Sequence, residues 1–526
     1  METGKQKNID IVYKARSPSE NPLAPHALSI SEGEMIAIKA RQRKVSAALQ
    51  KLGVEATKDK EPPIIAVLGS GGGLRAMVSL LGTLSELAKE DLLDVITYIC
   101  GTSGSTWCMA SLYNNDKWSS CMAEMESQMS DCLMKSAWDK NKAWEKLQES
   151  ISSGIYSLTN FWAYVVVYKV TNKLYETTLS DQRAACESGE NPYPVYSAVE
   201  KRHLNKNEPG AWFEFTPHLA GFPAYKSFVN TELLGSQFKG GELLKNYPEK
   251  DLCYLQGLWG SAPSSEDVMQ KVIKSMIQKI SPTSNASTSE DLLCSCSGCA
   301  KLLILLSHEL ADMTPEKIEQ FCNEIATALA DTYGGSCETV KVVSSVLQTF
   351  MEWIWGTTNN FLYEWKSDVP EDIYSKEFLN LVDAGLEINC AYPLMLPPNR
   401  KVDLILSFDY SDGNPFLTLQ ATAEYCKING IPFPKVNIDD KEIETPSKCC
   451  YVFEGGDNGA PDVMHFPLFN NQNAEGKVRE LREKYPTSNL SYDESELKEI
   501  LQLSKLNVQL SKPQILEKMQ QCIDRK

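Results

Sequence analysis

The chain has 526 residues, of which 42% are hydrophobic and 23% charged, a composition typical of a globular protein with a large core. Its formal net charge of −17 argues against nucleic acid as a partner, because no excess of lysine and arginine is present to neutralise phosphates. The same charge argues against recruitment to anionic membranes by charge alone.

No apolar run approaches the roughly 20 residues of a membrane-spanning helix, and no secretory signal is visible at the N-terminus. The 16 cysteines are therefore expected to be free thiols in a reducing compartment. These features together predict a cytosolic protein.

The chain opens with a polar, proline-containing segment over residues 1–29, which we expect to be a loose arm. A helix is predicted next, with Ser31 and Glu34 as a capping box and Gly53 as its stop. Five apolar residues fall on one face of this helix: Met35, Ile38, Val45, Leu49 and Leu52. Basic residues decorate the remainder: Lys39, Arg41, Arg43 and Lys44. Docking on the main domain is favoured, and contact with a membrane is the alternative.

Two strand–turn–helix units follow from residue 62. The apolar runs at 64–68 and 95–100 are typical of buried strands, and each ends in a glycine turn. A helix is predicted from Leu74 to Lys89 and another after residue 105. This order predicts an α/β fold, a large single domain with a mainly parallel central sheet flanked by helices.

The rest of the chain is less regular in pattern. Residues 110–200 are predicted to be mostly helical, residues 402–408 a strand, and the C-terminus from Asp493 helical. The segment 281–290 is low in complexity, which indicates a flexible loop within a lid-like insertion over 276–345. We therefore divide the chain into an N-terminal arm and helix over 1–60 and a catalytic domain over 61–526.

The two glycine turns carry the chemistry. In the second turn, small residues flank Ser103, as in a nucleophile elbow that exposes a serine hydroxyl at the end of a strand. The first turn, residues 69–75, supplies backbone N–H groups of the kind that form an oxyanion hole. Together the turns indicate a serine acyl hydrolase.

A serine nucleophile needs a base. The chain has five histidines: His26, His203, His218, His308 and His465. None of them lies in a turn typical of a catalytic triad, although triad partners from distant parts of a chain can still meet in space. The leading carboxylate is Asp383, which follows an apolar run and precedes Ala384 and Gly385. An exposed aspartate is a weak base, so this role requires desolvation.

At this point the chain resembles a known family. The matching motifs follow the order of that family: 69–75 (GSGGGLR), 101–107 (GTSGSTW), 212–218 (WFEFTPH), 258–261 (LWGS), 355–362 (WGTTNNFL), 383–385 (DAG), 431–435 (IPFPK) and 464–470 (MHFPLFN). They resemble the catalytic domain of the cytosolic phospholipases A2 (group IV) over roughly residues 60–480. Only about 60 residues precede the first motif, too few for the calcium-binding C2 domain, so the gamma-type branch without that domain is the nearest match.

The resemblance implies a patatin-like acyl hydrolase fold and a Ser–Asp dyad, with Ser103 as nucleophile and Asp383 as base. It assigns Gly72 and Gly73 to the oxyanion hole and Arg75 to the catalytic arginine, whose guanidinium suits a phosphate. The expected activity is calcium-independent hydrolysis of phospholipid acyl esters, with lysophospholipase and transacylase activity. No cofactor and no metal are expected. The expected partners are a phospholipid membrane surface or lipid droplet, bound peripherally, and a lysophospholipid as acyl acceptor.

Several alternatives stay open. A patatin-like hydrolase shares the dyad, and a catalytically silent member could serve as a structural or lipid-storage protein. Nucleotide binding at the first turn is disfavoured because no Gly-Lys-Ser/Thr follows it. Cys294, Cys296 and Cys299 with His308 resemble a zinc site weakly, and loop thiols are favoured. Arg75 could instead pair with a core carboxylate.

Overall fold

The structure is a computed structural model, and it describes residues 30–54, 61–135, 138–153, 155–261, 354–365, 369–456 and 459–526. The expected arm at 1–29, the insertion at 276–345 and the cysteines at 294–299 lie outside the described residues. Predictions for these segments remain untested.

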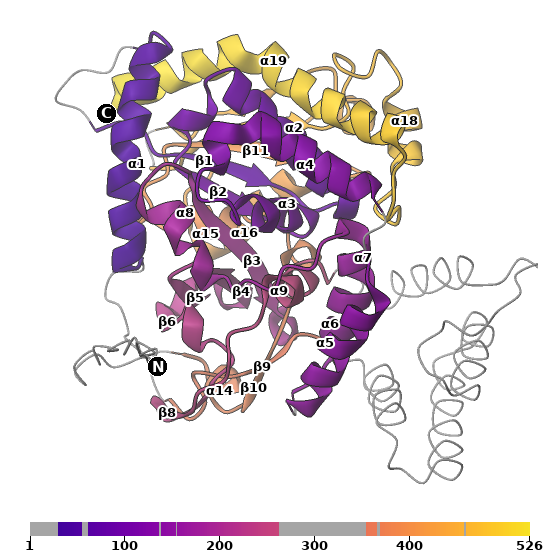
Figure 1. The fold of residues 1–526 in the computed structure, drawn as a ribbon. Helices are drawn as coiled ribbons and strands as arrows, with labels where there is room; N and C mark the ends of the chain where they lie inside the picture. Colours follow the sequence, from indigo (N-terminus) through magenta and orange to yellow (C-terminus); the bar gives the residue numbers. More distant parts are fainter. Residues whose placement is uncertain are drawn as a thin grey trace, which may run out of the picture.

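A mixed sheet of eleven strands forms the centre of the described part of the chain (Figure 1). Its middle is parallel, in the order β13-β11-β1-β2-β3. These five strands are β1 (Ile65–Gly69), β2 (Tyr98–Gly101), β3 (Tyr193–Glu200), β11 (Leu404–Asp409) and β13 (Asp462–Pro467). The prediction of an α/β fold around a mainly parallel sheet is confirmed.

Antiparallel strands extend this sheet on both sides. The additional strands are β12 (Tyr451–Phe453), β4 (Trp212–Phe215), β5 (Leu219–Phe222), β6 (Ser227–Asn230), β9 (Thr357–Asn359) and β10 (Phe378–Asp383). β10 pairs with β3 and β9, and a separate ribbon consists of β7 (Gln237–Lys239) and β8 (Glu242–Lys245). The prediction of mostly helix over 110–200 is wrong at its end, because β3 occupies 193–200. The aromatic and β-branched side chains of β3 suit a strand that is buried throughout.

Helix α2 (Gly73–Lys89) is the centre of one layer of helices. It contacts α3 (Gly104–Leu112), α4 (Met122–Met134) and α19 (Glu494–Arg525). α19 crosses the top of Figure 1 in yellow. Asp493 and Glu496 form a capping box at its start, which confirms the predicted C-terminal helix.

Shorter helices complete the described fold: α5 (Lys140–Ser152), α6 (Leu158–Phe161), α7 (Tyr168–Thr171), α8 (Arg183–Glu187), α9 (Leu252–Trp259), α14 (Glu371–Tyr374), α15 (Tyr392–Met395), α16 (Leu417–Asn429), α17 (Asp440–Glu444) and α18 (Val478–Lys484). A π-helical turn covers Trp162–Val167. Single 3₁₀ turns lie at Leu93–Val95, Trp118–Cys121, Ser180–Gln182, Lys201–His203, Pro209–Ala211, Pro223–Tyr225, Thr231–Leu233 and Ala384–Leu386.

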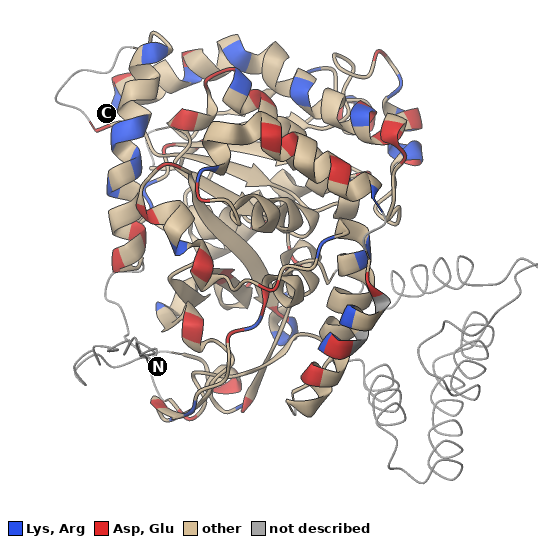
Figure 2. Ribbon diagram, viewed as in Figure 1, with Lys and Arg blue, Asp and Glu red and all other residues tan. Residues whose placement is uncertain are grey.

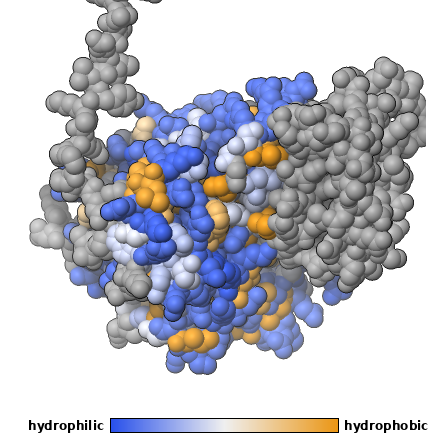
Figure 3. All heavy atoms as spheres, turned by 90° about the horizontal axis from the view of Figure 1, so that it is seen from below, coloured by the Kyte–Doolittle hydropathy of each residue, from blue (hydrophilic) through white to orange (hydrophobic). Residues whose placement is uncertain are grey.

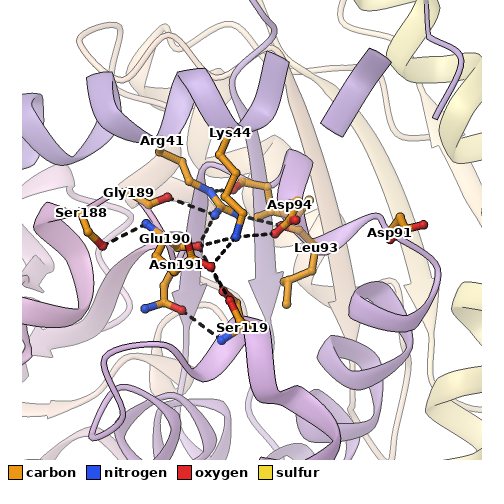
Figure 4. A network of polar contacts seen from close by, with 12 residues as sticks. Arg41, Lys44, Asp91, Leu93, Asp94, Ser119, Ser188, Gly189, Glu190 and Asn191 are labelled. Carbon is orange, nitrogen blue, oxygen red and sulfur yellow. Dashed lines mark hydrogen bonds and ion pairs between the residues drawn. The ribbon is translucent and has the colours of Figure 1, made fainter. Parts of the chain in front are cut away.

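Helix α1 (Glu32–Lys51) docks on the domain, as predicted, but through an unexpected face. Arg41, expected on the polar side, is 1% exposed and donates to the backbone carbonyls of Ile96 and Leu93, both at 2.8 Å. Its third nitrogen donates to the carbonyls of Gly189 and Glu190 (Figure 4). Burial lowers the pKa of Arg41 to about 10. The prediction that Arg41 faces solvent is therefore wrong. Its guanidinium can be buried because these carbonyls provide the hydrogen-bond partners that water would otherwise supply.

The start of α1 is also only partly as predicted. Ser31 caps the helix by accepting from the N–H of Glu34, and Gly53 follows its end with a φ of 74°. The Glu34 side chain does not complete a capping box, because it accepts from Arg400 Nε at 3.0 Å and from the Tyr98 hydroxyl at 3.0 Å. Among the apolar residues assigned to the docked face, Met35 is 39% exposed.

The surface carries both signs of charge. Figure 2 shows acidic and basic residues interspersed along the outer helices, with few on the central strands. Among the described helices, none has the length and apolar character needed to cross a bilayer. All eleven cysteines in the described ranges are free thiols, as predicted.

Candidate active site

Ser103 occupies the sharp turn between β2 and α3, with φ 52° and ψ −126°. This backbone conformation is costly for a residue with a side chain and persists only where the surrounding structure enforces it. The following turn of chain is close to the first glycine turn, since a Cβ atom placed on Gly104 would lie 1.9 Å from the carbonyl oxygen of Gly73. The predicted nucleophile elbow is therefore the observed geometry of this turn.

The first glycine turn ends in the N-terminus of α2. Gly72 has a φ of 151° and Gly73 a φ of 59°, conformations that glycine adopts without strain. Within the described residues neither of their N–H groups donates a hydrogen bond. They lie at the positive end of the α2 dipole, which favours negative charge nearby. The two turns thus bring a serine hydroxyl and uncommitted N–H donors to one edge of the sheet.

Hydrogen bonds from the backbone and from a serine side chain hold the two turns together. The N–H of Thr102 donates to the carbonyl of Gly69 at 3.0 Å, and Ser105 Oγ donates to the carbonyl of Ser70 at 2.6 Å. The N–H of Gly71 donates to the carbonyl of Asn389 at 3.0 Å. The turns are therefore fixed relative to one another.

Asp383 ends β10 at the same edge of the sheet. β10 pairs with the same edge of β3 as β2 does, just beyond the end of β2, and β4 takes the other edge; Tyr196 lies opposite Gly101 and Ala198 opposite Asp383. Asp383 thus lies two residues beyond the level of Gly101, as does Ser103 along its own chain. Its side chain is fully buried.

The loop after Asp383 contacts the serine turn. Asp383 Oδ1 accepts from the N–H of Gly385 at 2.8 Å, and the Asp383 N–H donates to Ser261 Oγ at 3.1 Å. A Cβ atom placed on Gly385 would lie 3.1 Å from Asp383 Oδ1 and 3.7 Å from Thr102 Cγ2. The structure therefore brings the neighbourhoods of Ser103 and Asp383 together.

Asn389 is a site residue that the sequence analysis did not find. A Cβ atom on Gly71 would lie 2.3 Å from Asn389 Oδ1 and 2.9 Å from Ser103 Cβ, and one on Gly385 would lie 2.9 Å from the same Oδ1. Asn389 Nδ2 donates to the Gly71 carbonyl at 3.3 Å and to Ser411 Oγ at 3.0 Å. The side chain joins the glycine turn to the Asp383 loop. Its only sequence signal is its position six residues after Asp383.

The described histidines have partners away from Ser103. The contacts are His203 with Glu208 (2.9 Å) and Asp372 (3.2 Å), His218 with Tyr193 (2.7 Å) and Glu187 (3.5 Å), and His465 with Ser407 (3.3 Å) and the Pro415 carbonyl (2.7 Å). His26 and His308 lie outside the described residues. In the described ranges, no group of His, Cys, Asp and Glu side chains is suited to hold a metal ion.

Arg75 lies in the first turn of α2 and is 1% exposed. Its guanidinium donates to the carbonyls of Tyr410 and Tyr485 at 2.6 and 2.5 Å. It also contacts Thr487 Oγ1 at 3.0 Å and pairs with Asp412 at 3.5 Å. Burial lowers the pKa of Arg75, against the opposing effect of Asp412. These contacts match the alternative in which Arg75 pairs with a carboxylate, and a bound phosphate would have to displace one of them.

The chain is similar to several known proteins of one family. A model of the lysophospholipase catalytic domain matches residues 65–301. The chain is 37% identical over 521 residues to cytosolic phospholipase A2 gamma of Homo sapiens, covering 93% of this chain and 94% of that protein. The solved structure of human GIVD cytosolic phospholipase A2 matches with a TM-score of 0.73 at 25% identity, over 97% of this chain and 69% of that chain. A second structure of it, in complex with methyl gamma-linolenyl fluorophosphonate, matches with a TM-score of 0.68 at 27% identity, over 97% and 66%.

Proposed function

This chain belongs to the cytosolic phospholipase A2 family, as its motifs indicated, and on that premise we propose that Ser103 and Asp383 hydrolyse fatty-acyl esters of glycerophospholipids without calcium. The lysophospholipase catalytic domain makes the protein an ester hydrolase. The observation that carries the proposed site is the strained backbone of Ser103, whose φ of 52° is expected of a serine held out of a strand–helix turn.

In the proposed reaction, Ser103 Oγ attacks the ester carbonyl carbon while the Asp383 carboxylate takes the hydroxyl proton. The N–H groups of Gly72 and Gly73 stabilise the oxyanion, and each such donor is worth about 10²–10³ in rate. The ester bond then breaks, and the lysophospholipid leaves with the proton from Asp383. Water, deprotonated by Asp383, attacks the acyl-serine; the bond between the acyl carbon and Ser103 Oγ breaks, Asp383 returns the proton to Oγ, and the fatty acid is released.

A carboxylate base is supported by what surrounds it. Asp383 is fully buried, and the loop that follows it contacts the serine turn. His203, His218 and His465 all bond to other groups, so they offer no competing base in the described part of the chain.

The same acyl-serine supports two further activities. A lysophospholipid is a smaller ester of the same kind, so it can serve as substrate. Its free hydroxyl can also replace water as the acceptor, which transfers the acyl group to a new phospholipid. We place this chemistry in the cytosol, at the surface of an intracellular membrane or lipid droplet. Arg75 supports it by contacting a headgroup phosphate or by fixing the glycine turn.

The test measures fatty-acid release from phosphatidylcholine vesicles with a calcium chelator present, comparing the native chain with Ser103→Ala. Ser111→Ala is the matched control, because its hydroxyl donates to the Trp107 carbonyl within α3. Release that survives chelation and the control, and is lost in Ser103→Ala, supports the proposal.

A second readout is covalent labelling by a fluorophosphonate, the class of reagent bound in the second solved structure. Its electrophilic phosphorus reacts with an activated serine, so we expect one labelled peptide, containing Ser103. Label on a different residue, or release that persists in Ser103→Ala, would contradict the assignment. A folded chain that neither labels nor releases fatty acid would indicate the silent, lipid-binding alternative.

A further inference from the structure

The β7–β8 ribbon carries two adjacent exposed leucines. Leu243 is 37% exposed and Leu244 55% exposed, and all four residues of β8 are exposed. Successive side chains of a strand point to opposite faces. Because both faces are open to solvent, β8 stands out from the body of the protein. An exposed apolar strand edge is a liability that soluble proteins usually avoid.

The ribbon is nevertheless firmly anchored. Phe238 of β7 is 2% exposed, and the N–H of Gly240 donates to the carbonyl of Tyr363 at 2.8 Å. Lys239 pairs with Glu364 at 3.3 Å. A Cβ atom on Gly241 would lie 2.8 Å from the ring of Trp365. The leucines are therefore presented by a fixed support.

The ribbon lies on the catalytic side of the sheet. Asn359 of β9 donates to the Gly235 carbonyl at 2.7 Å and is opposite Phe378, the first residue of β10. β10 runs antiparallel to β3 and pairs Leu381 with Glu200, the last residue of β3. Phe378 therefore lies beyond the carboxyl end of β3, and it is 39% exposed. The same strand leads inward to the carboxylate of Asp383.

The surroundings have the composition of a membrane-interface segment. The Lys245 ammonium lies 4.4 Å from the ring centre of Tyr247, and Trp365 lies under the turn. Amphipathic aromatic and lysine side chains beside exposed leucines suit the boundary between headgroups and acyl chains. Figure 3 shows apolar side chains among hydrophilic ones on the face seen from below, the side where β8 and α14 lie in Figure 1.

We propose that Leu243 and Leu244 insert into the surface of a zwitterionic phospholipid bilayer and hold the catalytic edge against it. The proposal rests on the proposed function, which needs substrate from a bilayer. The charge selects the lipid: the chain carries −17, and in this region Lys239 lies opposite Glu242 in the ribbon and forms an ion pair with Glu364. Without a surplus of positive charge, attraction must come from apolar burial.

The test is co-sedimentation of the full chain with phosphatidylcholine vesicles, comparing the native protein with the double variant Leu243→Glu/Leu244→Glu. The matched control is Leu510→Glu on α19, since Leu510 is 49% exposed and α19 lies at the opposite side of the molecule in Figure 1. We expect the double variant to partition at least ~10-fold more weakly, because it loses the apolar surface of two leucines that would be buried in the bilayer and adds two carboxylates. The control should bind like the native chain, and anionic lipid added to the vesicles should not strengthen binding.

Turnover of a soluble short-chain ester is measured in parallel. We expect it to be the same in the native chain and in the double variant, so that loss of vesicle binding is separated from loss of folding or chemistry. Equal vesicle binding of the native chain and the double variant would overturn the proposal, as would equal loss in Leu510→Glu. A native chain that binds vesicles through these leucines but turns over no ester would instead contradict the proposed function and support the docking surface.

Discussion

Polar groups are buried both at the edge of the sheet near Ser103 and at the interface between α1 and residues 93–96 and 189–190, here called the seam. The two regions differ in whether these groups have hydrogen-bond partners. At the seam, Arg41 is buried with its nitrogens bonded to carbonyls of other segments (Figure 4). At the edge, the N–H groups of Gly72 and Gly73 donate to nothing among the described residues, and Ser103 is held at a φ of 52°.

The difference separates groups that stabilise the fold from groups kept available for a substrate. A buried donor without a partner costs about 1–3 kcal/mol, and a strained backbone costs a similar amount. Such costs are tolerated where donors must meet a charge that forms only during reaction. Changes at the edge should therefore reduce activity more than stability, and changes at the seam should do the reverse.

The largest effect is expected from Asp383→Asn. The amide keeps the size of the carboxylate and can still accept from Gly385, but it cannot take the serine proton. We expect kcat/KM to fall by at least ~10³-fold, with the melting temperature changed by only a few degrees. The control is Asp372→Asn, whose carboxylate lies on the surface beside His203. A variant that keeps kcat/KM within tenfold of the native value would rule out Asp383 as the base.

Arg41→Met should show the opposite behaviour. It removes the Arg41 donors from four carbonyls, of which those of Ile96 and Gly189 have no other hydrogen-bond partner among the described residues, while keeping apolar volume, so the free energy of unfolding should fall by about 3 kcal/mol. Urea denaturation measures this loss, and kcat/KM at a temperature below the transition should stay within twofold. Lys51→Met is the control, since Lys51 forms an exposed pair with Asp91 on the same helix. A large loss of activity in the folded variant would mean that the seam is coupled to the site.

Arg75→Lys tests a residue that belongs to both regions, because the Arg75 guanidinium is fully bonded yet lies next to Gly72. Lysine keeps the charge but cannot reach both carbonyls with fixed geometry. We expect about 2 kcal/mol of lost stability together with a lower kcat, as the glycine turn loosens. If Arg75 instead acts only on a phosphate, KM will rise while kcat and the urea midpoint stay unchanged.

The catalytic edge could largely be predicted from sequence because its signals are local. Small residues and glycines that follow an apolar strand specify the turns at 69–75 and 101–105 without distant partners. Asp383 was identified by its flanking residues and the family resemblance, and the pairing of β10 with β3 places it at the predicted edge.

The contacts of the seam could not be predicted, because the groups that Arg41 bonds are distant in sequence and are backbone carbonyls, which carry no sequence signal. Arg41 donates to backbone carbonyls 52 to 149 residues away, and any residue type carries a carbonyl. Hydrophobic periodicity assigns a charged residue to solvent, so Arg41 was placed on the wrong side of α1, and Glu34 was expected in a capping box rather than bonded to Arg400. The role of Asn389 could not be predicted for the same reason, since its contact with Gly71 spans 318 residues.

The smallest expected effect is that of His465→Gln, which should change the pH dependence of stability but not that of activity. His465 lies within β13, opposite Ser407 of β11, and is fully buried; burial lowers its pKa below the usual value near 6.5, although Asp409 opposes this. Below about pH 6.5 the unfolded chain binds a proton that the folded chain excludes, so the contribution is fully present above that pH and is lost as the pH falls. We expect the native chain to lose about 1 kcal/mol more than His465→Gln between pH 7.5 and pH 5.5, measured by urea denaturation. Parallel pH curves for the two proteins would show that His465 does not carry this dependence. Because His465 contacts Ser407 and Pro415 rather than Ser103, the pH profile of kcat/KM should keep its midpoints in the variant.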